Sequence, residues 1–335
     1  MRLLITGGTG FFGRAILRYL ESVRHSTGTL PFEQVTVLSR SPDRFCTQYP
    51  ELANLSWLTW HCGDVLAPNT LPQDGCFHSI IHAATDSTND AALTPLQIHQ
   101  QIVDGTKNML QFAASKNVKR FLLTSSGAAY GAQPVGMEAM PETYNGMPDP
   151  LKPANAYGVA KRQAEHLCVL YGERHAFESV IARCFAFVGR DLPLNNHFAI
   201  GNFIRDALWR DEITVAGDGT AIRSYLDQNN LAEWLLRLLE SGQTGCAYNV
   251  GSDRAISISD LAYLVRDLVS PGKPVRILGK STGNEARTRY VPEISRARAE
   301  LGLTVTIPLM DAIQACAAAV KSSESLKNIQ GSING

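Results

Sequence analysis

Tyr157 and Lys161 are the residues whose types and spacing point most directly to chemistry, because they stand four apart at the start of a predicted helix. An i,i+4 spacing places both side chains on one helix face. A phenol titrates at about pH 10, and a neighbouring cation favours the phenolate. The pair can therefore move a proton near neutral pH. Such a pair also occurs in ordinary surface packing, so its surroundings decide between the two interpretations.

A glycine-rich segment, Thr6–Gly13, follows the first predicted strand and opens the first predicted helix. In a pyrophosphate-binding loop Gly7 allows the tight turn, Gly10 lets the backbone approach the phosphates, and Gly13 lets helix and strand pack closely. The helix N-terminus adds free N–H groups and a positive dipole end. The segment therefore predicts a dinucleotide site. Its predicted contacts are Gly7, Gly10, Phe11, Phe12 and Gly13.

The end of the second predicted strand distinguishes the two nicotinamide dinucleotides. An acidic residue there would bond the adenosine ribose, whereas a cation suits a 2′-phosphate. The chain has Ser39 and Arg40 at this point, and a guanidinium can bind phosphate through two hydrogen bonds. NADP is therefore favoured, with NAD as the alternative if Arg40 is only a solvated cation near Asp43. The other predicted cofactor contacts, after the third and fourth strands, are Asp64, Val65, Ala83 and Ala84.

Short apolar runs alternate with helical patterns in the first half of the chain, which indicates βαβ units and a parallel sheet. Because crossovers are right-handed, this order builds a Rossmann-type doubly wound sheet with its ligand crevice at the carboxyl ends of the strands. The predicted strands are Arg2–Thr6, Val35–Ser39, Trp57–His61, Ser79–His82, Arg120–Thr124 and Ser179–Arg183. The clearest predicted helices are Phe11–Val23, Thr94–Lys116 and Tyr157–His175.

Beyond Arg183 this alternation loosens, which predicts a smaller C-terminal α/β cap that binds the substrate. The cap is expected to include a helix near Phe198–Arg210, followed by the segment Ile213–Ala216. Three later segments could rejoin the sheet, namely Tyr225–Leu226, Leu231–Leu239 and Cys246–Val250. The predicted dinucleotide-binding domain is thus 1–183 plus about 225–250, and the predicted cap is 184–224 plus 251–320. Residues 321–335 are polar and are expected to form a flexible tail.

The composition excludes several classes of function. Lys plus Arg and Asp plus Glu each number 31, so no global field favours nucleic acid or an anionic membrane. The seven cysteines show no CxxC spacing, and their odd number opposes a complete disulfide framework. The sequence shows neither a signal peptide nor a transmembrane run, so a cytoplasmic location is expected. His78, His82 and His197 lack metal-ligand spacing, so no metal is predicted.

Ser125–Gly131, which ends the fifth predicted strand, gives the other motifs their context. Together with Thr6–Gly13 and Tyr157–Lys161 it resembles the extended short-chain dehydrogenase/reductase family, in its nucleotide-sugar epimerase, dehydratase and reductase branch. Ile222–Leu226 resembles the substrate-binding segment of that branch. The resemblance covers roughly residues 1–310 and implies an enzyme.

The resemblance also implies individual roles. Ser126 would bond the substrate oxygen, Tyr157 would be the acid/base, and Lys161 would lower the pKa of Tyr157 and bind the nicotinamide ribose. Arg223 resembles the arginine that contacts the substrate diphosphate, and Arg289 is a second candidate for that task. The same resemblance implies a twofold homodimer through the helices at Thr94–Lys116 and Tyr157–His175. The apolar residues cited for this interface are Met109, Leu110, Phe112, Leu167, Val169 and Leu170.

Two positions depart from the pattern of the branch. The dehydratases carry acidic residues directly after the catalytic serine or threonine, where this chain has Gly127 and Ala128. Ala186 stands where many relatives have an asparagine that contacts phosphate. A 4,6-dehydratase would therefore lack the groups that carry its elimination.

Several functions remain open at this stage. An NADPH-dependent 4-keto-sugar reductase is favoured by Arg40, and a 4-epimerase that retains NAD would use the same residues. A non-catalytic NADP-binding regulator is disfavoured because the Tyr157–Lys161 pair is present. An enzyme that reduces a steroid, flavonoid or isoprenoid ketone would not need Arg223. The expected substrate is thus a nucleoside-diphosphate sugar.

Overall fold

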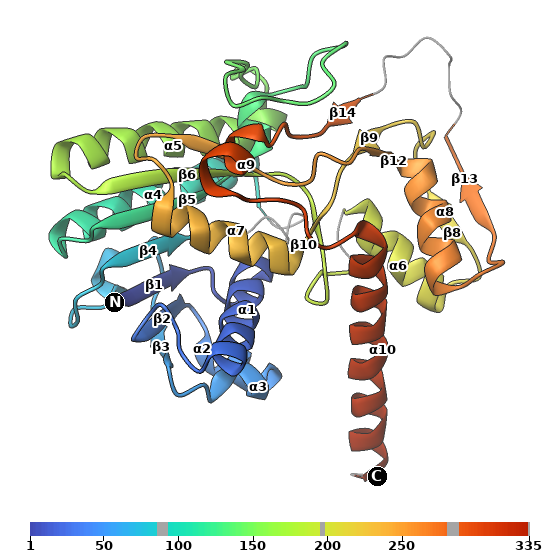
Figure 1. Ribbon diagram of the computed structural model, residues 1–335, viewed down its shortest axis with the longest axis horizontal. Coiled ribbons are helices and arrows are strands. Elements are labelled where there is room, and N and C mark those ends of the chain that lie inside the picture. The colour runs from blue at the N-terminus through green and yellow to red at the C-terminus, as the bar shows by residue number, and fades with distance from the viewer. Residues whose placement is uncertain (86–92, 195–197, 280–287, 334–335) are drawn as a thin grey trace.

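A parallel sheet forms the centre of the molecule in the computed structural model, which describes residues 1–85, 93–194, 198–279 and 288–333, with side chains through residue 322. Within these residues the sheet has seven strands in the order β11-β6-β5-β4-β1-β2-β3 (Figure 1). The strands are β1 (Arg2–Thr6), β2 (Gln34–Ser39), β3 (Leu58–Cys62), β4 (Ser79–His82), β5 (Arg120–Ser126), β6 (Glu178–Cys184) and β11 (Ala247–Val250). The chain order reverses between β1 and β4, which is where a doubly wound sheet binds its ligand.

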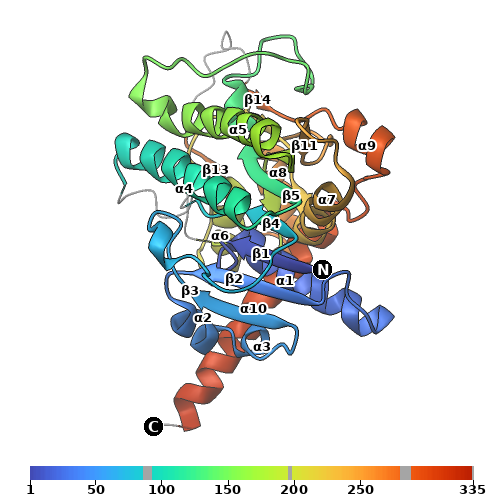
Figure 2. The same cartoon turned by 90° about the vertical axis from the view of Figure 1, so that its left-hand side faces the viewer.

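Helices cover both faces of this sheet, and all four residues of β4 are accordingly buried. The helices are α1 (Phe11–Thr27), α2 (Pro42–Gln48), α3 (Pro50–Ala53), α4 (Pro95–Ser115), α5 (Ala156–His175) and α7 (Gln228–Ser241). Figure 2 shows α4 and α5 side by side on one face, and the two helices bury a common apolar core. Helices α1 and α7 bury the core of the opposite face. The predicted Rossmann-type sheet is confirmed.

A smaller α/β region follows β6, and most of it lies to the right in Figure 1, whereas its α9 lies near the centre above α7. Its elements are β7 (Phe187–Val188), α6 (Ala199–Trp209), β8 (Ile213–Val215), β9 (Ile222–Arg223), β10 (Leu226–Asp227), β12 (Ile256–Ser257), α8 (Ile258–Val269), β13 (Val275–Ile277), β14 (Arg289–Tyr290), α9 (Ser295–Leu301) and α10 (Leu309–Ile333). Helices α6, α8 and α10 share an apolar core with β8. Apart from β10, which falls in the segment 225–250 assigned by prediction to the dinucleotide-binding domain, and the end of α10, these elements lie within the residues predicted to form the cap.

Residues near α9 leave the cap and return to the sheet. Ile294, Ala297 and Leu303 are buried in the same core as α1 and α7. The boundaries predicted for the two domains stay a prediction, and this return shows that contacts cross them.

The predicted strands lie within two residues of those observed, but two of the three segments expected to rejoin the sheet behave differently. Cys246–Val250 does so as β11. Leu231–Leu239 lies instead in α7, because its apolar residues recur at helical spacing and Asp227 caps the helix by accepting from Asn229 N. Leu226 pairs with Phe187 in a separate two-stranded sheet.

The C-terminal segment continues a helix where a flexible tail is predicted. The backbone of α10 is helical from Leu309 to Ile333, and no proline or glycine interrupts it before Gly331. Neither α10 nor any other helix of the described residues is long and apolar enough to cross a membrane.

The two helices of the predicted dimer interface expose fewer apolar groups than the sequence suggests. Met109, Leu110 and Phe112 are buried in the core beneath α4 and α5, whereas Val169 and Leu170 are 37% and 46% exposed. The first three residues therefore give no support to an interface, and the homodimer stays a prediction.

Candidate functional site

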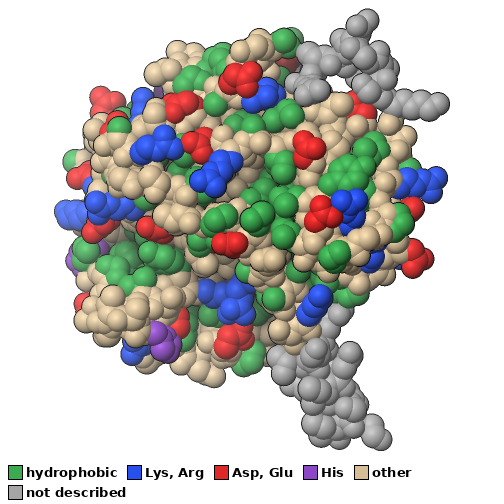
Figure 3. Space-filling model, turned by 45° about the vertical axis from the view of Figure 1, so that its right-hand side comes forward, with side chains coloured by type: hydrophobic (Ala, Val, Ile, Leu, Met, Phe, Trp, Pro, Cys, Tyr) green, Lys and Arg blue, Asp and Glu red, His purple; other side chains and the backbone are tan. Residues whose placement is uncertain are grey.

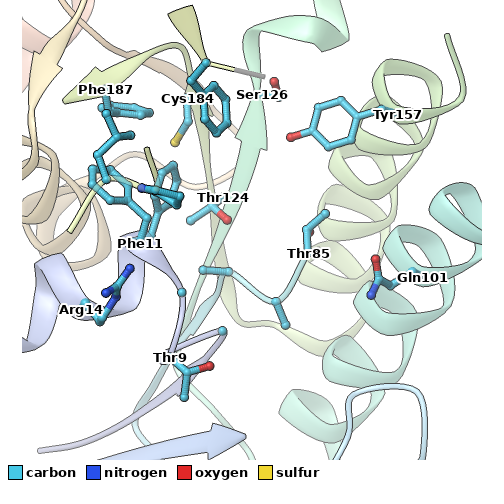
Figure 4. Close-up of a pocket in the computed structure, with 18 of the residues that line it drawn as sticks. Thr9, Phe11, Arg14, Thr85, Gln101, Thr124, Ser126, Tyr157, Cys184 and Phe187 are labelled. Atoms are coloured by element: carbon cyan, nitrogen blue, oxygen red, sulfur yellow. The ribbon is translucent and has the colours of Figure 1, made fainter. Parts of the chain in front are cut away.

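A cavity of about 1230 Å³ lies at the carboxyl ends of the parallel strands. The glycine-rich turn, the strand ends and residues of the cap line it, and Figure 4 shows Tyr157 and Gln101, on helices α5 and α4, at the side facing Phe11 and Phe187. The structure brings together predicted site residues from separate segments of the chain. All of them except Gly13 and Arg289 line the cavity.

The glycine-rich turn has the geometry of a pyrophosphate cradle. Gly7 has a φ of +74°, and a Cβ at this position would lie 2.3 Å from the carbonyl oxygen of Ala83, so only glycine fits where the ends of β1 and β4 meet. Gly10 N donates to Gly7 O at 3.0 Å. No side chain caps α1, which leaves its first N–H groups for a ligand. The residues present therefore fit a dinucleotide.

Gly13 has a packing role. A Cβ there would lie 2.1 Å from Gly8 Cα, so its absence lets α1 approach the turn closely. Gly13 therefore supports the cradle without lining the cavity.

The part of the cavity beside the end of β2 and the start of α2 carries cations. Arg40 and Arg44 both line the cavity and are exposed, and the sequence analysis missed Arg44 although it follows Arg40 by four residues. Asp64 and Val65 line the same end. Asp64 Oδ1 also accepts from Leu66 N at 2.9 Å, so this residue caps a turn as well.

Lys161 is buried beside Tyr157 on α5. Its Nζ lies 5.7 Å from the centroid of the Tyr157 ring and donates to Thr124 O at 2.9 Å and to Thr85 Oγ1 at 3.0 Å. Burial lowers the pKa of Lys161 to about 8. The ammonium thus stands next to the phenol, although its charge is more easily lost than that of an exposed lysine.

Ser126 ends β5 and begins a short 3-10 helix, η2 (Gly127–Tyr130), in which its Oγ accepts from Ala128 N at 3.1 Å. Figure 4 shows the hydroxyl of Tyr157 pointing across the cavity toward Ser126. Tyr290 of β14 lines the same cavity, and its hydroxyl donates to Cys184 O at 3.5 Å. Ser126, Tyr157 and Lys161 therefore all line the same cavity.

A buried polar network supports this centre from below. Ser125 Oγ donates to Glu165 Oε1 at 2.5 Å, and Arg183 donates to both oxygens of the Glu165 carboxylate at 3.0 and 2.7 Å. The Arg183 guanidinium lies 4.4 Å from the centroid of the Tyr130 ring, and Tyr130 OH donates to Asn249 Oδ1 at 2.8 Å. These contacts tie β5, α5, β6 and β11 together, so they hold Ser126 in register with Tyr157.

The cap end of the cavity is apolar apart from a few groups. Arg223 of β9 lines it and donates to Ile222 O at 2.8 Å and to Thr288 O at 3.1 Å. Arg289 is turned away and pairs with the Glu138 carboxylate at 2.7 Å, so its predicted contact with substrate would require that pair to open. Apolar or aromatic residues that line this end are Phe185, Ala186, Phe187, Leu192, Pro193, Phe198 and Tyr225.

The histidines singled out by the sequence analysis have structural surroundings where they are described. His82 is buried, its Nδ1 lies 2.7 Å from Thr6 Oγ1, and burial lowers its pKa to about 3. Arg2 N donates to His78 Nδ1 at 3.2 Å. His197 lies outside the described residues. In the part of the chain that was described, no group of three or more His, Cys, Asp or Glu could hold a metal ion.

Comparison with known proteins identifies the family. The sequence model of the NAD dependent epimerase/dehydratase family matches residues 3–251. The chain belongs to this family.

One relative of this chain is UDP-glucuronic acid decarboxylase 3 of Arabidopsis thaliana. The two are 29% identical over 320 residues, which cover 93% of this chain and 87% of the relative. Among solved structures, dTDP-glucose 4,6-dehydratase DesIV from Streptomyces venezuelae, with NAD and TYD bound, has a TM-score of 0.81 at 22% identity, covering 97% of this chain and 98% of the other.

RMD from Pseudomonas aeruginosa, complexed with NADPH, has a TM-score of 0.77 at 24% identity, covering 96% of this chain and 99% of the other. These likenesses to solved structures concern the fold. Together with the family match, they confirm the predicted enzyme of the short-chain dehydrogenase/reductase type.

The sequence analysis did not identify several of the residues that line the cavity. Thr85, Arg14 and Gln101 line it in addition to Arg44 and Tyr290. Thr85 carries no motif, since its bond to Lys161 joins residues 76 apart in the chain. For Tyr290, the only indication in the sequence was its position next to Arg289.

Proposed function

We propose that this enzyme uses NADPH to reduce a keto group, at C4, of a nucleoside-diphosphate sugar. The observation that carries the proposal is the end of β2, where Arg40 and Arg44 line the cavity and the strand ends in Ser39 in place of a carboxylate. Two guanidiniums suit a 2′-phosphate, and NADPH is the usual donor for a net reduction. The complex of RMD with NADPH supports this, whereas DesIV holds NAD.

The chain's own residues supply the rest of the reaction. Bound NADPH would supply the hydride. Ser126 donates a hydrogen bond to the keto oxygen, and Tyr157 transfers its proton to that oxygen as the alcohol forms. Lys161 holds a positive charge beside the phenol and, through Thr85 and Thr124, keeps a fixed position. Gly7, Gly10 and the uncapped end of α1 would hold the pyrophosphate.

The charges that line the cavity favour simple reduction over elimination. Among the described lining residues, Asp64 is the only carboxylate, and it belongs to the adenosine end with Arg40. Removal of a C5 proton needs a base near the sugar, and positions 127 and 128 are Gly and Ala. Tyr157 alone suffices for a carbonyl reduction.

The proposed substrate class rests on Arg223 and on the relatives. The relative from Arabidopsis is named for UDP-glucuronic acid and DesIV for dTDP-glucose. The chain has equal numbers of cationic and anionic side chains, and Figure 3 shows the two kinds interspersed over one face of the molecule. Such a surface has no general attraction for anions, so Arg223 in the cavity points to a local contact with a diphosphate.

A second candidate is a reaction with retained NAD, either epimerisation at C4 or decarboxylation of a nucleoside-diphosphate uronic acid. The sequence similarity over 93% of the chain to a decarboxylase favours it. In both reactions hydride leaves C4 and later returns. In a uronic acid the carboxylate is carried by C5, next to the C4 ketone, so it can leave as carbon dioxide while the electrons of the broken bond enter the ketone as an enolate. Tyr157 and Lys161 would serve either one.

One experiment separates these candidates. The purified protein is denatured and any released dinucleotide is identified, and the native protein is assayed for NADPH oxidation with UDP-, dTDP-, GDP- and CDP-linked 4-keto sugars. We expect no retained NAD and NADPH oxidation with at least one sugar nucleotide. Stoichiometric NAD, with C4 epimer or carbon dioxide as product, would refute the reductase.

Replacement of Arg40 by Asp tests the cofactor. The change removes an attraction for the 2′-phosphate and adds a repulsion, so we expect NADPH affinity to fall by roughly ten- to a hundredfold while NADH affinity holds or rises. Calorimetric titration of both dinucleotides measures this. Arg237→Asp, on the outer side of α7, is the matched control. Equal responses of the two dinucleotides would show that Arg40 does not contact the 2′-phosphate.

A further inference from the structure

Asp191 lies in the loop between β7 and α6, and its carboxylate is buried against two helices of the main sheet. Arg18 Nε of α1 donates to Asp191 Oδ2 at 3.0 Å, and Arg14 Nη1 lies 3.5 Å from Asp191 Oδ1. Gln228 Nε2 of α7 donates to Asp191 Oδ2 at 3.1 Å. The Asp191 side chain is only 4% exposed. A loop of the cap is thus bonded to both helices that pack on this face of the sheet.

The backbone of Asp191 is held as firmly as its carboxylate. Asp191 N donates to Gln228 Oε1 at 2.9 Å, and Arg14 Nη2 donates to Asp191 O at 2.8 Å. A Cβ at Gly189 would lie 2.4 Å from Gln228 Cγ, so a side chain at 189 would separate the loop from α7. These contacts fix the position of Asp191 relative to α1 and α7.

The residues directly after Asp191 belong to the wall of the cavity. Leu192 and Pro193 line its substrate end, and Leu192 N donates to Gly189 O at 3.0 Å. A Cβ at Gly201 of α6 would lie 2.8 Å from Pro193 O, so α6 packs directly on the same segment. We call residues 189–194 the wall loop. Asp191 is the residue that connects this loop to α1.

Arg14 connects the wall loop to the dinucleotide end of the cavity. Of the three described residues that bond Asp191, only Arg14 also lines the cavity. Its backbone N donates to Gly10 O at 3.0 Å, which places it in the first turn of α1, and its Nη1 donates to Tyr49 OH at 2.6 Å. Figure 4 shows Arg14 well apart from Tyr157. One guanidinium therefore contacts the loop from the side where the pyrophosphate is expected.

The charge of Arg14 makes its position sensitive to an anion. A cation in the first turn of a helix is unfavourable, because that end of the helix carries positive partial charge. The first turn of α1 contains no acidic residue, and the buried Arg14 Nε has no hydrogen-bond partner among the described residues. Asp191 supplies a negative charge from outside the helix. A pyrophosphate at the same helix end would supply more and would hold Arg14 in place.

We propose that Asp191 is a positioning residue through which a bound dinucleotide orders the wall loop for the sugar nucleotide. The pyrophosphate stabilises Arg14, Arg14 holds Asp191, and Asp191 holds Leu192 and Pro193 in the cavity wall. Binding at one end then strengthens binding at the other, and the effect is reciprocal. The ordering of the loop requires only NADP or NAD in the cradle, whereas its effect on the sugar nucleotide rests on the proposed function.

Amide hydrogen exchange in the wall loop tests the ordering, because Asp191 N and Leu192 N both donate hydrogen bonds there. The whole protein, freed of any dinucleotide that it retains, is measured with and without a saturating concentration of NADP⁺ or NAD⁺, whichever binds more tightly. We expect the dinucleotide to slow exchange of residues 189–194 about tenfold in the wild type. In Asp191→Asn, which keeps the shape and loses the charge, it should not. Equal slowing in both proteins, or none in the wild type, would overturn the proposal.

Arg14→Lys and Arg18→Lys form a matched pair, since both arginines belong to α1 and both bond Asp191. A lysine keeps the charge but lacks the fork that lets Arg14 bond Tyr49 OH and Asp191 O together. The dinucleotide should therefore no longer slow exchange in Arg14→Lys, whereas in Arg18→Lys it should. Each variant is compared with itself in the free and bound states, so a general loss of stability does not decide the result. Equal responses of the two variants would contradict transmission through Arg14.

Steady-state kinetics tests the consequence for the substrate. Asp191→Asn should raise KM for the sugar nucleotide about tenfold and change kcat by less than about twofold, because the wall loop contacts the bound substrate away from Tyr157. A loss confined to kcat, or an unchanged KM, would overturn the role of Asp191 while the proposed function stands. Slowed exchange in a protein that turns over no sugar nucleotide would refute the proposed function and leave the ordering of the loop established.

Discussion

The two ends of the cavity are built by different means. The dinucleotide end is formed largely by backbone, with Gly7 held against Ala83 and the first N–H groups of α1 left without a side-chain cap. The substrate end is formed by side chains from distant parts of the chain, among them Arg223 and Tyr290. We expect the backbone of the dinucleotide end to bind the pyrophosphate, which all NAD(P) cofactors share. The side chains of the substrate end, by contrast, can change with single substitutions. Specificity should therefore reside at the substrate end.

The place where the two ends meet should show the largest effect. Tyr157→Phe keeps the ring and removes the proton, so we expect kcat to fall by roughly 10²–10⁴-fold. NADPH affinity, measured by calorimetry, should stay within about twofold. Near wild-type turnover would show that another group supplies the proton.

Arg223→Ala sharpens the contrast on the substrate side. A charge-assisted hydrogen bond contributes about 1.5–3 kcal/mol, so KM for the sugar nucleotide should rise by roughly one to two orders of magnitude. Affinity for NADPH should not change. Arg276→Ala, on β13 outside the cavity, serves as the control. Equal KM values for Arg223→Ala and the wild type would leave the diphosphate without its proposed partner.

The pH dependence of kcat/KM tests the role of Lys161, which lies where the dinucleotide end and the substrate end meet. Its pKa is about 8 in the folded protein, and the ammonium is the active form, so kcat/KM should fall as pH rises through 8 and be about tenfold lower one unit above it. In Lys161→Arg the charge persists, and the residual activity should lose this alkaline limb. A limb that stays near pH 8 in that variant would belong to another group.

The lowered pKa of Lys161 also affects stability, which should rise with pH whereas kcat/KM falls. The unfolded chain binds this proton more tightly than the folded one between pH 8 and the ordinary lysine pKa of about 10.5, so the stability contributed by Lys161 rises with pH across that window. The free energy of unfolding of the wild type should accordingly rise by up to about 3 kcal/mol relative to that of Lys161→Met from pH 8 to 10.5. Urea titrations at both pH values measure it.

The smallest effect is expected in the cradle. A Cβ at Gly10 has only Gly7 O nearby, at 3.4 Å, so Gly10→Ala should leave stability nearly unchanged but weaken NADPH binding severalfold by obstructing the pyrophosphate. Gly13→Ala would collide with Gly8 and should destabilise the protein by about 1–3 kcal/mol. Thermal unfolding with and without NADPH separates the two variants. Unchanged NADPH affinity in Gly10→Ala would place the pyrophosphate elsewhere.

The sequence reveals the dinucleotide end better than the substrate end for a physical reason. Strands β1 and β4 were predicted to the residue, and α5 begins one residue before Tyr157, because local periodicity and glycine spacing determine these features. Thr85 and Tyr290 carry no such pattern. Thr85 contacts Lys161 and Tyr290 packs on Phe185. Both pairs are distant in sequence, so only the folded chain brings them together. The helix at Leu231–Leu239 was missed because a short apolar run is compatible with strand or helix.

The packing of α9 against the helices of the sheet has a consequence for folding during translation. A nascent chain that ended at residue 251, where the family match stops, would contain every strand of the main sheet. It would nevertheless lack Ile294, Ala297 and Leu303, which bury themselves in the core of α1 and α7, and the Glu300 carboxylate that accepts from Tyr248 OH. The first 251 residues would therefore expose apolar surface on α1 and α7 until residue 303 has been synthesised, and we expect chaperone binding during translation to matter most in that interval.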